Sequence, residues 1–233
     1  MTLKDVVEVG VNCVWPPTCA ACRQVVQANG ALCQSCWAEL QFLPHNVAGD
    51  IDSLPGVYAA VCYDGVAQEI VKAFKFRQKV RLGRTLGALL YLCHRDLLNC
   101  VDCLVPVPLH RQRLFERGYN QSALLAKELS LHVKELEVCN GLVRNRKTSQ
   151  QIGLSRAARW KNLSGSMVID EIARSDLAGK RVLLVDDVYT SGATLHACTR
   201  ALQHEGVDVL GGLVFARALP ERMVLDMDLQ KDN

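Results

Sequence analysis

Apolar runs and segments with helically spaced apolar residues alternate along the chain after residue 55. A run bounded by turn residues is typical of a buried strand, whereas apolar residues three or four positions apart are typical of a helix covering a sheet. The predicted strands cover 57–63, 103–109, 181–185 and 207–215. The predicted helices lie within 70–90, 120–130 and 192–204. This alternation predicts an α/β fold with a parallel sheet.

The segment 181–195 carries the clearest chemical signal. Its apolar strand runs into two adjacent carboxylates, Asp186 and Asp187, and a turn rich in hydroxyl groups precedes the next helix. Ligands of open parallel sheets bind at the carboxyl ends of the strands. Backbone N–H groups of such a turn converge on an anion at the helix N-terminus, and Gly192 allows a close approach. An acidic helix cap is the simpler alternative, but a cap needs neither the second aspartate nor the following Thr-Ser-Gly-Ala-Thr sequence.

The two aspartates indicate that the ligand contains a second group besides phosphate, because carboxylates do not bind phosphate. They accept hydrogen bonds from a ribose diol or bind magnesium, which prefers oxygen ligands. The segment therefore predicts a sugar phosphate site. Neither the Walker motif nor the Rossmann glycine motif occurs in the sequence. The residues predicted to hold the phosphate and the ribose are Asp186, Asp187, Val188, Tyr189, Thr190, Ser191, Gly192, Ala193 and Thr194.

Near the N-terminus, two C-x-x-C knuckles lie ten residues apart. Their members are Cys19, Cys22, Cys33 and Cys36. Each knuckle supplies two of the four thiolates of a tetrahedral zinc site. A module this small has too little core to fold without a metal, so we expect structural zinc. Redox-active cysteines and knuckles that hold no metal are the alternatives. We divide the chain into a zinc module at 1–52, a larger domain at 53–220 and a polar tail at 221–233.

Composition and charge narrow the range of partners. The 233 residues are 49% hydrophobic. The net charge of +3 is unevenly distributed, because the central part of the sequence is strongly basic. Residues 70–165 hold 18 Lys and Arg against 6 Asp and Glu, which favours a phosphate-rich or polyanionic ligand, although solvated helix surfaces give the same pattern. No stretch predicts membrane insertion, and the N-terminus lacks an export signal. Eleven cysteines without such a signal favour reduced thiols in the cytoplasm.

The segment around Asp186 resembles the phosphoribosyl pyrophosphate (PRPP) loop of type I phosphoribosyltransferases. The shared pattern is an apolar strand, two acidic residues, two variable residues and Thr-Ser-Gly-x-Thr. The resemblance implies PRPP bound with magnesium, a catalytic or binding role for Asp186 and Asp187, a pyrophosphate loop after 105–108 and a basic lid at 144–162. The pyrophosphate-binding candidates are Pro108, Arg113, Arg117, Arg159 and Arg217.

Further segments resemble the ComF family. They are the cysteine knuckles, the sequence Val-Pro-Val-Pro-Leu-His followed by Arg-Gly-Tyr-Asn-Gln-Ser, and the pattern Thr148…Gln151…Gly153-Leu154-Ser155…Arg159…Asn162. The similarity extends over 19–217, with Thr190-Ser191 where Thr-Thr is commoner. This family is associated with natural competence, the uptake of single-stranded DNA. The resemblance implies a zinc module followed by a type I phosphoribosyltransferase-like domain.

The ComF resemblance implies an accessory protein of DNA uptake that binds PRPP and single-stranded DNA and contacts DNA-translocation or recombination proteins. The DNA-binding candidates are Lys72, Lys75, Arg77, Lys79 and Arg81. Phe74 and Phe76 interleave with these cations as stacking side chains do, but a helix core explains them equally. The alternatives are an active phosphoribosyltransferase, which joins phosphoribose to a nitrogen base and releases pyrophosphate, and a zinc-containing structural adaptor.

Overall fold

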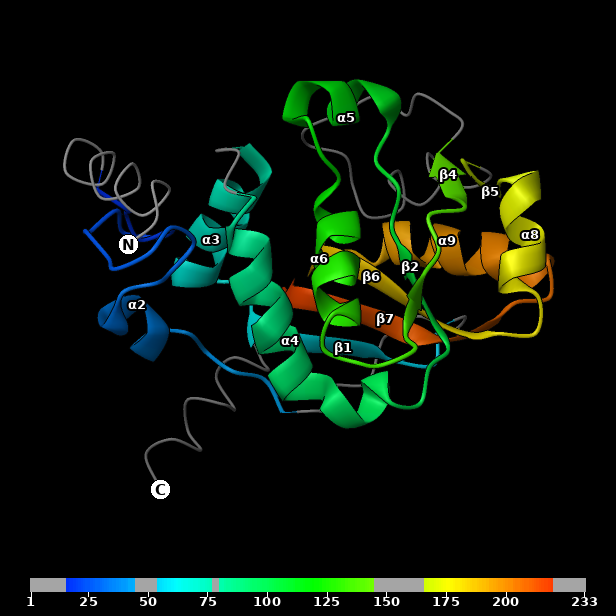
Figure 1. The fold of residues 1–233 in the computed structure, drawn as a ribbon, viewed down its shortest axis with the longest axis horizontal. Coiled ribbons are helices and arrows are strands. Elements are labelled where there is room, and N and C mark those ends of the chain that lie inside the picture. Colours follow the sequence, from blue (N-terminus) through cyan, green and yellow to red (C-terminus); the bar gives the residue numbers. More distant parts are fainter. Residues whose placement is uncertain (1–15, 45–53, 77–79, 145–165, 220–233) are drawn as a thin grey trace, which may run out of the picture.

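The computed structural model describes residues 16–44, 54–76, 80–144 and 166–219. Its centre is a five-stranded sheet in the order β1-β7-β6-β2-β3, in which every neighbouring pair is parallel (Figure 1). The strands are β1 (Val57–Cys62), β2 (Cys103–Pro106), β3 (Glu137–Val138), β6 (Arg181–Tyr189) and β7 (Asp208–Arg217). The predicted α/β architecture with a parallel sheet is therefore confirmed.

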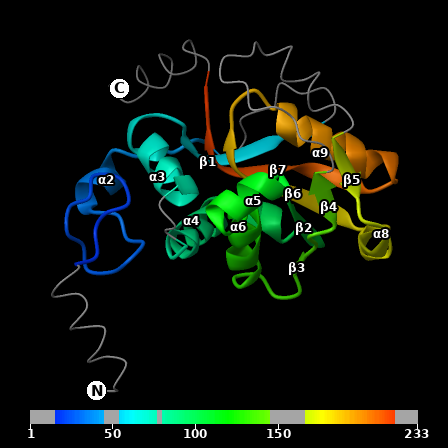
Figure 2. The ribbon, with the colours of Figure 1, turned by 90° about the horizontal axis from the view of Figure 1, so that it is seen from above.

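Helices cover both faces of this sheet, as Figure 2 shows. One face packs against α3 (Gly65–Phe76), α4 (Leu82–Leu98) and α6 (Gln121–Ser130). The other packs against α8 (Glu171–Leu177) and α9 (Ala193–His204). Among the described helices, none combines the length and the apolar content that a membrane crossing requires.

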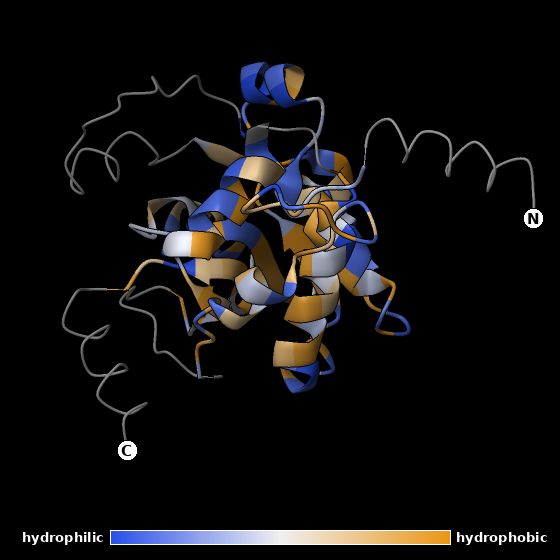
Figure 3. Cartoon of the chain, turned by 90° about the vertical axis from the view of Figure 1, so that its left-hand side faces the viewer, coloured by the Kyte–Doolittle hydropathy of each residue, from blue (hydrophilic) through white to orange (hydrophobic). Residues whose placement is uncertain are grey.

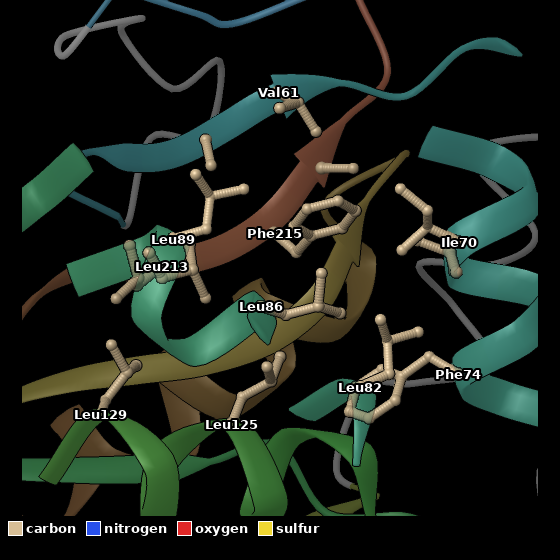
Figure 4. Close-up of a cluster of buried hydrophobic side chains, with 14 of the residues drawn as sticks. Val61, Ile70, Phe74, Leu82, Leu86, Leu89, Leu125, Leu129, Leu213 and Phe215 are labelled. Atoms are coloured by element: carbon tan, nitrogen blue, oxygen red, sulfur yellow. The ribbon is translucent and has the colours of Figure 1, made fainter. Parts of the chain in front are cut away.

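The larger core lies between the sheet and α3, α4 and α6 (Figure 4). Phe215 of β7 points toward Ile70 of α3 and Leu86 of α4, and all three side chains are buried. Phe74 is also completely buried, next to Leu82. The interpretation of Phe74 as a stacking residue for DNA is therefore wrong, because its ring belongs to the core. The side chain of Phe76 lies outside the described residues.

The sequence predicted neither β3 nor α8, and it also missed the following features. Leu142–Arg144 (β4) and Met167–Ile169 (β5) form an antiparallel pair outside the main sheet, in which Arg144 lies opposite Met167. The predicted lid begins at Arg144, and its remaining residues lie outside the described part. Residues 111–117, expected as a loop, form a short helix, α5 (Arg111–Arg117).

The zinc module packs directly on the larger domain. Its helix α2 (Gln34–Ala38) carries Cys36, which belongs to the same apolar cluster as α4. The Gly30 carbonyl accepts a hydrogen bond of 2.9 Å from Thr85 Oγ1, and a Cβ at Gly30 would lie 2.7 Å from the Arg81 carbonyl oxygen. Only glycine fits this close approach, which fixes the module against the start of α4.

We expect a methyl group at Gly87 to destabilise the fold. A Cβ there would lie 2.6 Å from Cβ of Glu128, so Gly87 lets α4 approach α6 closely. Alanine favours a helix by about 1 kcal/mol over glycine, but overpacking costs about 1–3 kcal/mol. Denaturant unfolding of Gly87→Ala should therefore show a net loss. Adding Glu128→Gly should restore part of it, and a Gly87→Ala variant more stable than wild type would contradict the close packing.

Candidate functional site

The candidate site begins with the turn that joins β6 to α9. Gly192 is the N-cap of α9 and has φ 75°, a conformation that glycine adopts without strain. Ala193 is buried behind it, whereas Thr190 is exposed. The N–H groups of the first helical turn have no partners within the helix, so they are available to an anion at the C-terminal end of β6.

Asp186 is half-buried near the C-terminal end of β6. One carboxylate oxygen, Oδ1, accepts hydrogen bonds from Ser122 Oγ at 2.8 Å and from the backbone N–H of Asp187 at 2.9 Å. Burial and the neighbouring charge of Asp187 raise the pKa of the Asp186 carboxyl to about 7, against the opposing effect of Lys75 and the two hydrogen bonds. A substantial fraction of Asp186 is therefore protonated at neutral pH.

Asp187 is paired with a lysine. Its carboxylate Oδ1 lies 3.0 Å from Nζ of Lys75, which comes from the last turn of α3, and the Asp187 side chain is only 8% exposed. The sequence placed Lys75 among the DNA-binding candidates. In the structure it faces the phosphoribosyl candidate Asp187, so its charge belongs to that site.

Two arginines approach the same end of the sheet. Arg117, at the end of α5, donates from Nη1 to Oε1 of Gln121 at 3.0 Å. Burial and the nearby Arg113 lower the pKa of its guanidinium, whereas the charge of Asp187 raises it. Arg217 ends β7, is 2% exposed, and lies 5.2 Å from the ring centroid of Tyr189. The charge of Arg117 thus interacts with that of Asp187, whereas Arg217 is buried beside Tyr189.

The remaining candidates divide by position. Pro108 is buried beside α5, and Arg113 is half-buried on that helix. The candidates Arg77, Lys79 and Arg159 lie outside the described residues. The sequence did not assign a role to Ser122, Gln121 or Tyr119, although all three stand in the Arg-Gly-Tyr-Asn-Gln-Ser sequence. Tyr119 donates a hydrogen bond from its hydroxyl to the carbonyl of Phe74, which ties this sequence to α3.

The four predicted zinc ligands come together. The Sγ atoms of Cys19, Cys22, Cys33 and Cys36 all lie within 4.8 Å of one another, and those of Cys22 and Cys33 are 3.5 Å apart. The backbone N–H of Cys33 also donates to Cys19 Sγ at 3.4 Å. Four thiols in such a cluster fit one tetrahedral zinc ion, which supports a structural metal in this module.

Comparison with known proteins supports both the cysteine cluster and the fold of the larger domain. Residues 10–64 match the double zinc ribbon domain family, and residues 122–230 match the phosphoribosyl transferase domain family. Over 224 residues the chain is 31% identical to competence protein F of Haemophilus influenzae, covering 86% of this chain and 96% of that protein. The chain belongs to the competence protein F family.

Other relatives of this competence protein F homologue carry related names. DNA utilization protein YhgH of Escherichia coli is 26% identical over 197 residues, which are 81% of this chain and 85% of that protein. Competence protein ComFC of Bacillus subtilis is 34% identical over 103 residues, covering 44% of this chain and 39% of that protein. The expected resemblance to the ComF family is therefore confirmed, together with the zinc ribbon and phosphoribosyltransferase-type fold.

Loss of one thiolate should remove the metal. We expect Cys36→Ser to purify with far less than one zinc ion per chain and with a lower melting temperature, because structural zinc contributes about 10–16 kcal/mol to small zinc modules. Zinc released by a thiol-reactive mercurial and detected with a chromogenic chelator gives the stoichiometry. Cys93→Ser in α4 is the matched control and should keep its zinc. Full zinc occupancy in Cys36→Ser would contradict the assignment.

Asp186 should make stability depend on pH near neutrality. An acid whose pKa is higher in the folded chain stabilises the fold at low pH, and this contribution is lost as pH rises through the folded pKa of about 7. Between about pH 5 and 7, wild type should lose up to about 1.4 kcal/mol per pH unit relative to Asp186→Asn. Urea unfolding across this range measures the difference. Asp176→Asn on exposed α8 should keep the wild-type profile, and parallel profiles for wild type and Asp186→Asn would contradict this interpretation.

Proposed function

We propose that this competence protein F homologue binds PRPP with magnesium at the C-terminal end of β6 and acts in the use or uptake of single-stranded DNA. The observation that carries the ligand is the pair Asp186 and Asp187, followed by a hydroxyl-rich turn that starts α9 at Gly192. The printed names of the relatives, competence protein F and DNA utilization protein, support the biological role.

In the proposed complex, the turn from Thr190 to Thr194 binds the 5′-phosphate through backbone N–H groups and hydroxyls. Asp187 accepts hydrogen bonds from the ribose hydroxyls, and its present partner Lys75 turns toward the added negative charge of the ligand. Arg113 and Arg117 bind the pyrophosphate, since a guanidinium pairs with two phosphate oxygens at once. Arg217 adds a cation at the end of β7.

The residues at this site fit a magnesium ion that arrives with the ligand. Magnesium prefers carboxylate, phosphate and water oxygens and usually keeps several waters. Asp186 and Asp187 offer carboxylates, but a substantial fraction of Asp186 is protonated at neutral pH and Asp187 pairs with Lys75. Among the described residues, the four cysteines form the one cluster of three or more potential metal ligands. A magnesium ion would therefore be held mainly by oxygens of the ligand, with Asp186 and Asp187 close by, and it would neutralise part of the ligand's charge.

Catalysis is the second candidate function. It is favoured by Arg117, whose charge interacts with that of Asp187, because a cation beside this carboxylate would stabilise a departing pyrophosphate. A phosphoribosyltransferase would then transfer phosphoribose to a nitrogen base: the bond from C1 to pyrophosphate breaks, and the bond from C1 to the base nitrogen forms. Pyrophosphate release with a panel of nucleobases tests this candidate separately from binding.

The α3–α4 surface is weaker support for DNA contact than the sequence indicated. Lys72 forms an ion pair of 2.8 Å with Glu69, Lys75 faces Asp187, and Phe74 lies in the core. Arg81 is exposed at the start of α4. Among the described candidates of this surface, Lys72 and Arg81 are therefore those directed to solvent.

PRPP with magnesium should raise the melting temperature of the zinc-loaded protein. A ligand that binds only the folded state adds about 2.7 kcal/mol at 100 times its Kd, or about 5–10 °C for a domain of this size. Asp187→Asn should lose most of this shift, because it loses the carboxylate that holds the ribose. Differential scanning fluorimetry measures both proteins.

The matched control is Asp208→Asn, which removes an exposed carboxylate at the opposite end of β7 and should keep the full shift. Ribose 5-phosphate should shift the melting temperature less than PRPP, because it lacks the pyrophosphate. The proposed ligand is refuted by an unchanged melting temperature of folded, zinc-loaded wild type at saturating PRPP and magnesium.

A further inference from the structure

The helix α5 contributes nothing to the core. None of its seven residues is buried, Leu114 is 43% exposed and Phe115 is 91% exposed. The helix lies at the edge of the molecule between β2 and α6, and Figure 3 shows it at the top with hydrophilic and hydrophobic positions side by side. Both ends are nevertheless capped, by His110 Nδ1 and by Gly118 in the left-handed conformation. A helix this short depends on such caps, and five of its seven residues are exposed.

The side chains of α5 face two different parts of the molecule, the phosphoribosyl site and a groove beside β4. Arg113 and Arg117 are one helical turn apart, and the charge of Arg117 interacts with Asp187 in the phosphoribosyl site. Arg111 and Leu114 instead line a groove between α5 and β4, and Phe115 is one turn after Arg111. The second side of the helix is therefore not needed to explain PRPP binding.

The groove combines an apolar floor with positive charge. Its volume is about 530 Å³, within the range of sites for small ligands, and Pro106, Pro108 and Leu142 form part of its wall. Arg111 and Arg144 line it, against one carboxylate, Asp170. Asp170 already accepts a hydrogen bond of 3.1 Å from Ile172 N as the cap of α8. The charge of the groove thus favours an anion.

The arginines near this groove repel one another. Burial and the nearby charge of Arg113 lower the pKa of Arg144, and Arg113 has the same effect on Arg117. Phosphates placed among these side chains relieve the repulsion between like charges. The structure thus offers several guanidinium groups beside an exposed aromatic ring, the combination with which proteins bind the backbone and bases of a single strand.

We propose that single-stranded DNA lies in this groove, with its phosphates on Arg111 and Arg144 and an unpaired base stacked on Phe115. This inference rests on the proposed function in DNA use and moves the DNA contact from α3–α4 to α5 and β4. Exposed Phe115 supplies a ring that the buried Phe74 cannot. A duplex keeps its bases stacked inside, so the contact with Phe115 selects single strands.

The test is the binding of a labelled oligothymidylate to full-length, zinc-loaded protein, followed by fluorescence anisotropy over a range of salt concentrations. Phe115→Ala should raise the Kd about tenfold through lost stacking. Arg111→Ala should weaken binding and reduce the slope of log K against log salt by about 0.7, the change for one phosphate contact on a single strand. Leu131→Ala removes another exposed apolar side chain, 70% exposed and at the end of α6, and should bind as wild type does.

The possible results distinguish an error in the location of the DNA site from an error in the proposed DNA function. If wild type binds DNA and only Lys72→Ala and Arg81→Ala weaken it, the groove assignment is overturned while the DNA function stands. If wild type binds no oligonucleotide at low salt, both are overturned. Equal weakening by Leu131→Ala would also overturn the role of Phe115. Phe115→Ala should keep the melting-temperature shift with PRPP and magnesium, which shows that its PRPP site remains intact.

Discussion

Two consecutive carboxylates near the C-terminal end of β6, one half-buried and one buried, impose the main constraint on this fold. Two negative charges in such a place repel each other and lose hydration. The chain resolves this conflict differently for each residue: Asp186 shifts toward its protonated form and accepts a hydrogen bond from Ser122, whereas Asp187 pairs with Lys75 at 3.0 Å. The helices α3 and α6 must therefore lie where their side chains can reach the strand.

Core packing holds these helices in place. The side chain of Phe74 is buried in the core, and that of the next residue, Lys75, forms an ion pair with Asp187. The last turn of α3 therefore contributes both to the apolar core and to neutralising the charge of Asp187. Tyr119 bonds the carbonyl of Phe74 just before α6 begins, and Gly87 allows α4 to pack closely against α6. The position of the site is thus a consequence of how the apolar side chains pack, and a disturbance of α3 reaches both the core and the charges.

The sequence predicted the elements whose chemistry is local. The apolar run before Asp186, the turn around Gly192 and the paired cysteine knuckles each carry their meaning within a few residues, and the structure has the predicted strand, helix start and thiol cluster. The contact of Lys75 with Asp187 depends on where α3 ends relative to β6, which no local pattern encodes. The helix α5 escaped prediction because it has no apolar face, and β4 and β5 are only three residues long.

The arginines give the two proposed ligands a common physical link. Arg113 is the neighbour whose charge affects both Arg117, on the phosphoribosyl side, and Arg144, in the groove. A pyrophosphate on one side and a DNA phosphate on the other would therefore draw on the same positive charge. If both proposed ligands bind, each anion would weaken the attraction that the other experiences, and thermodynamic linkage would make the two effects equal. PRPP would then oppose DNA binding through the charges of α5 without any change of the core.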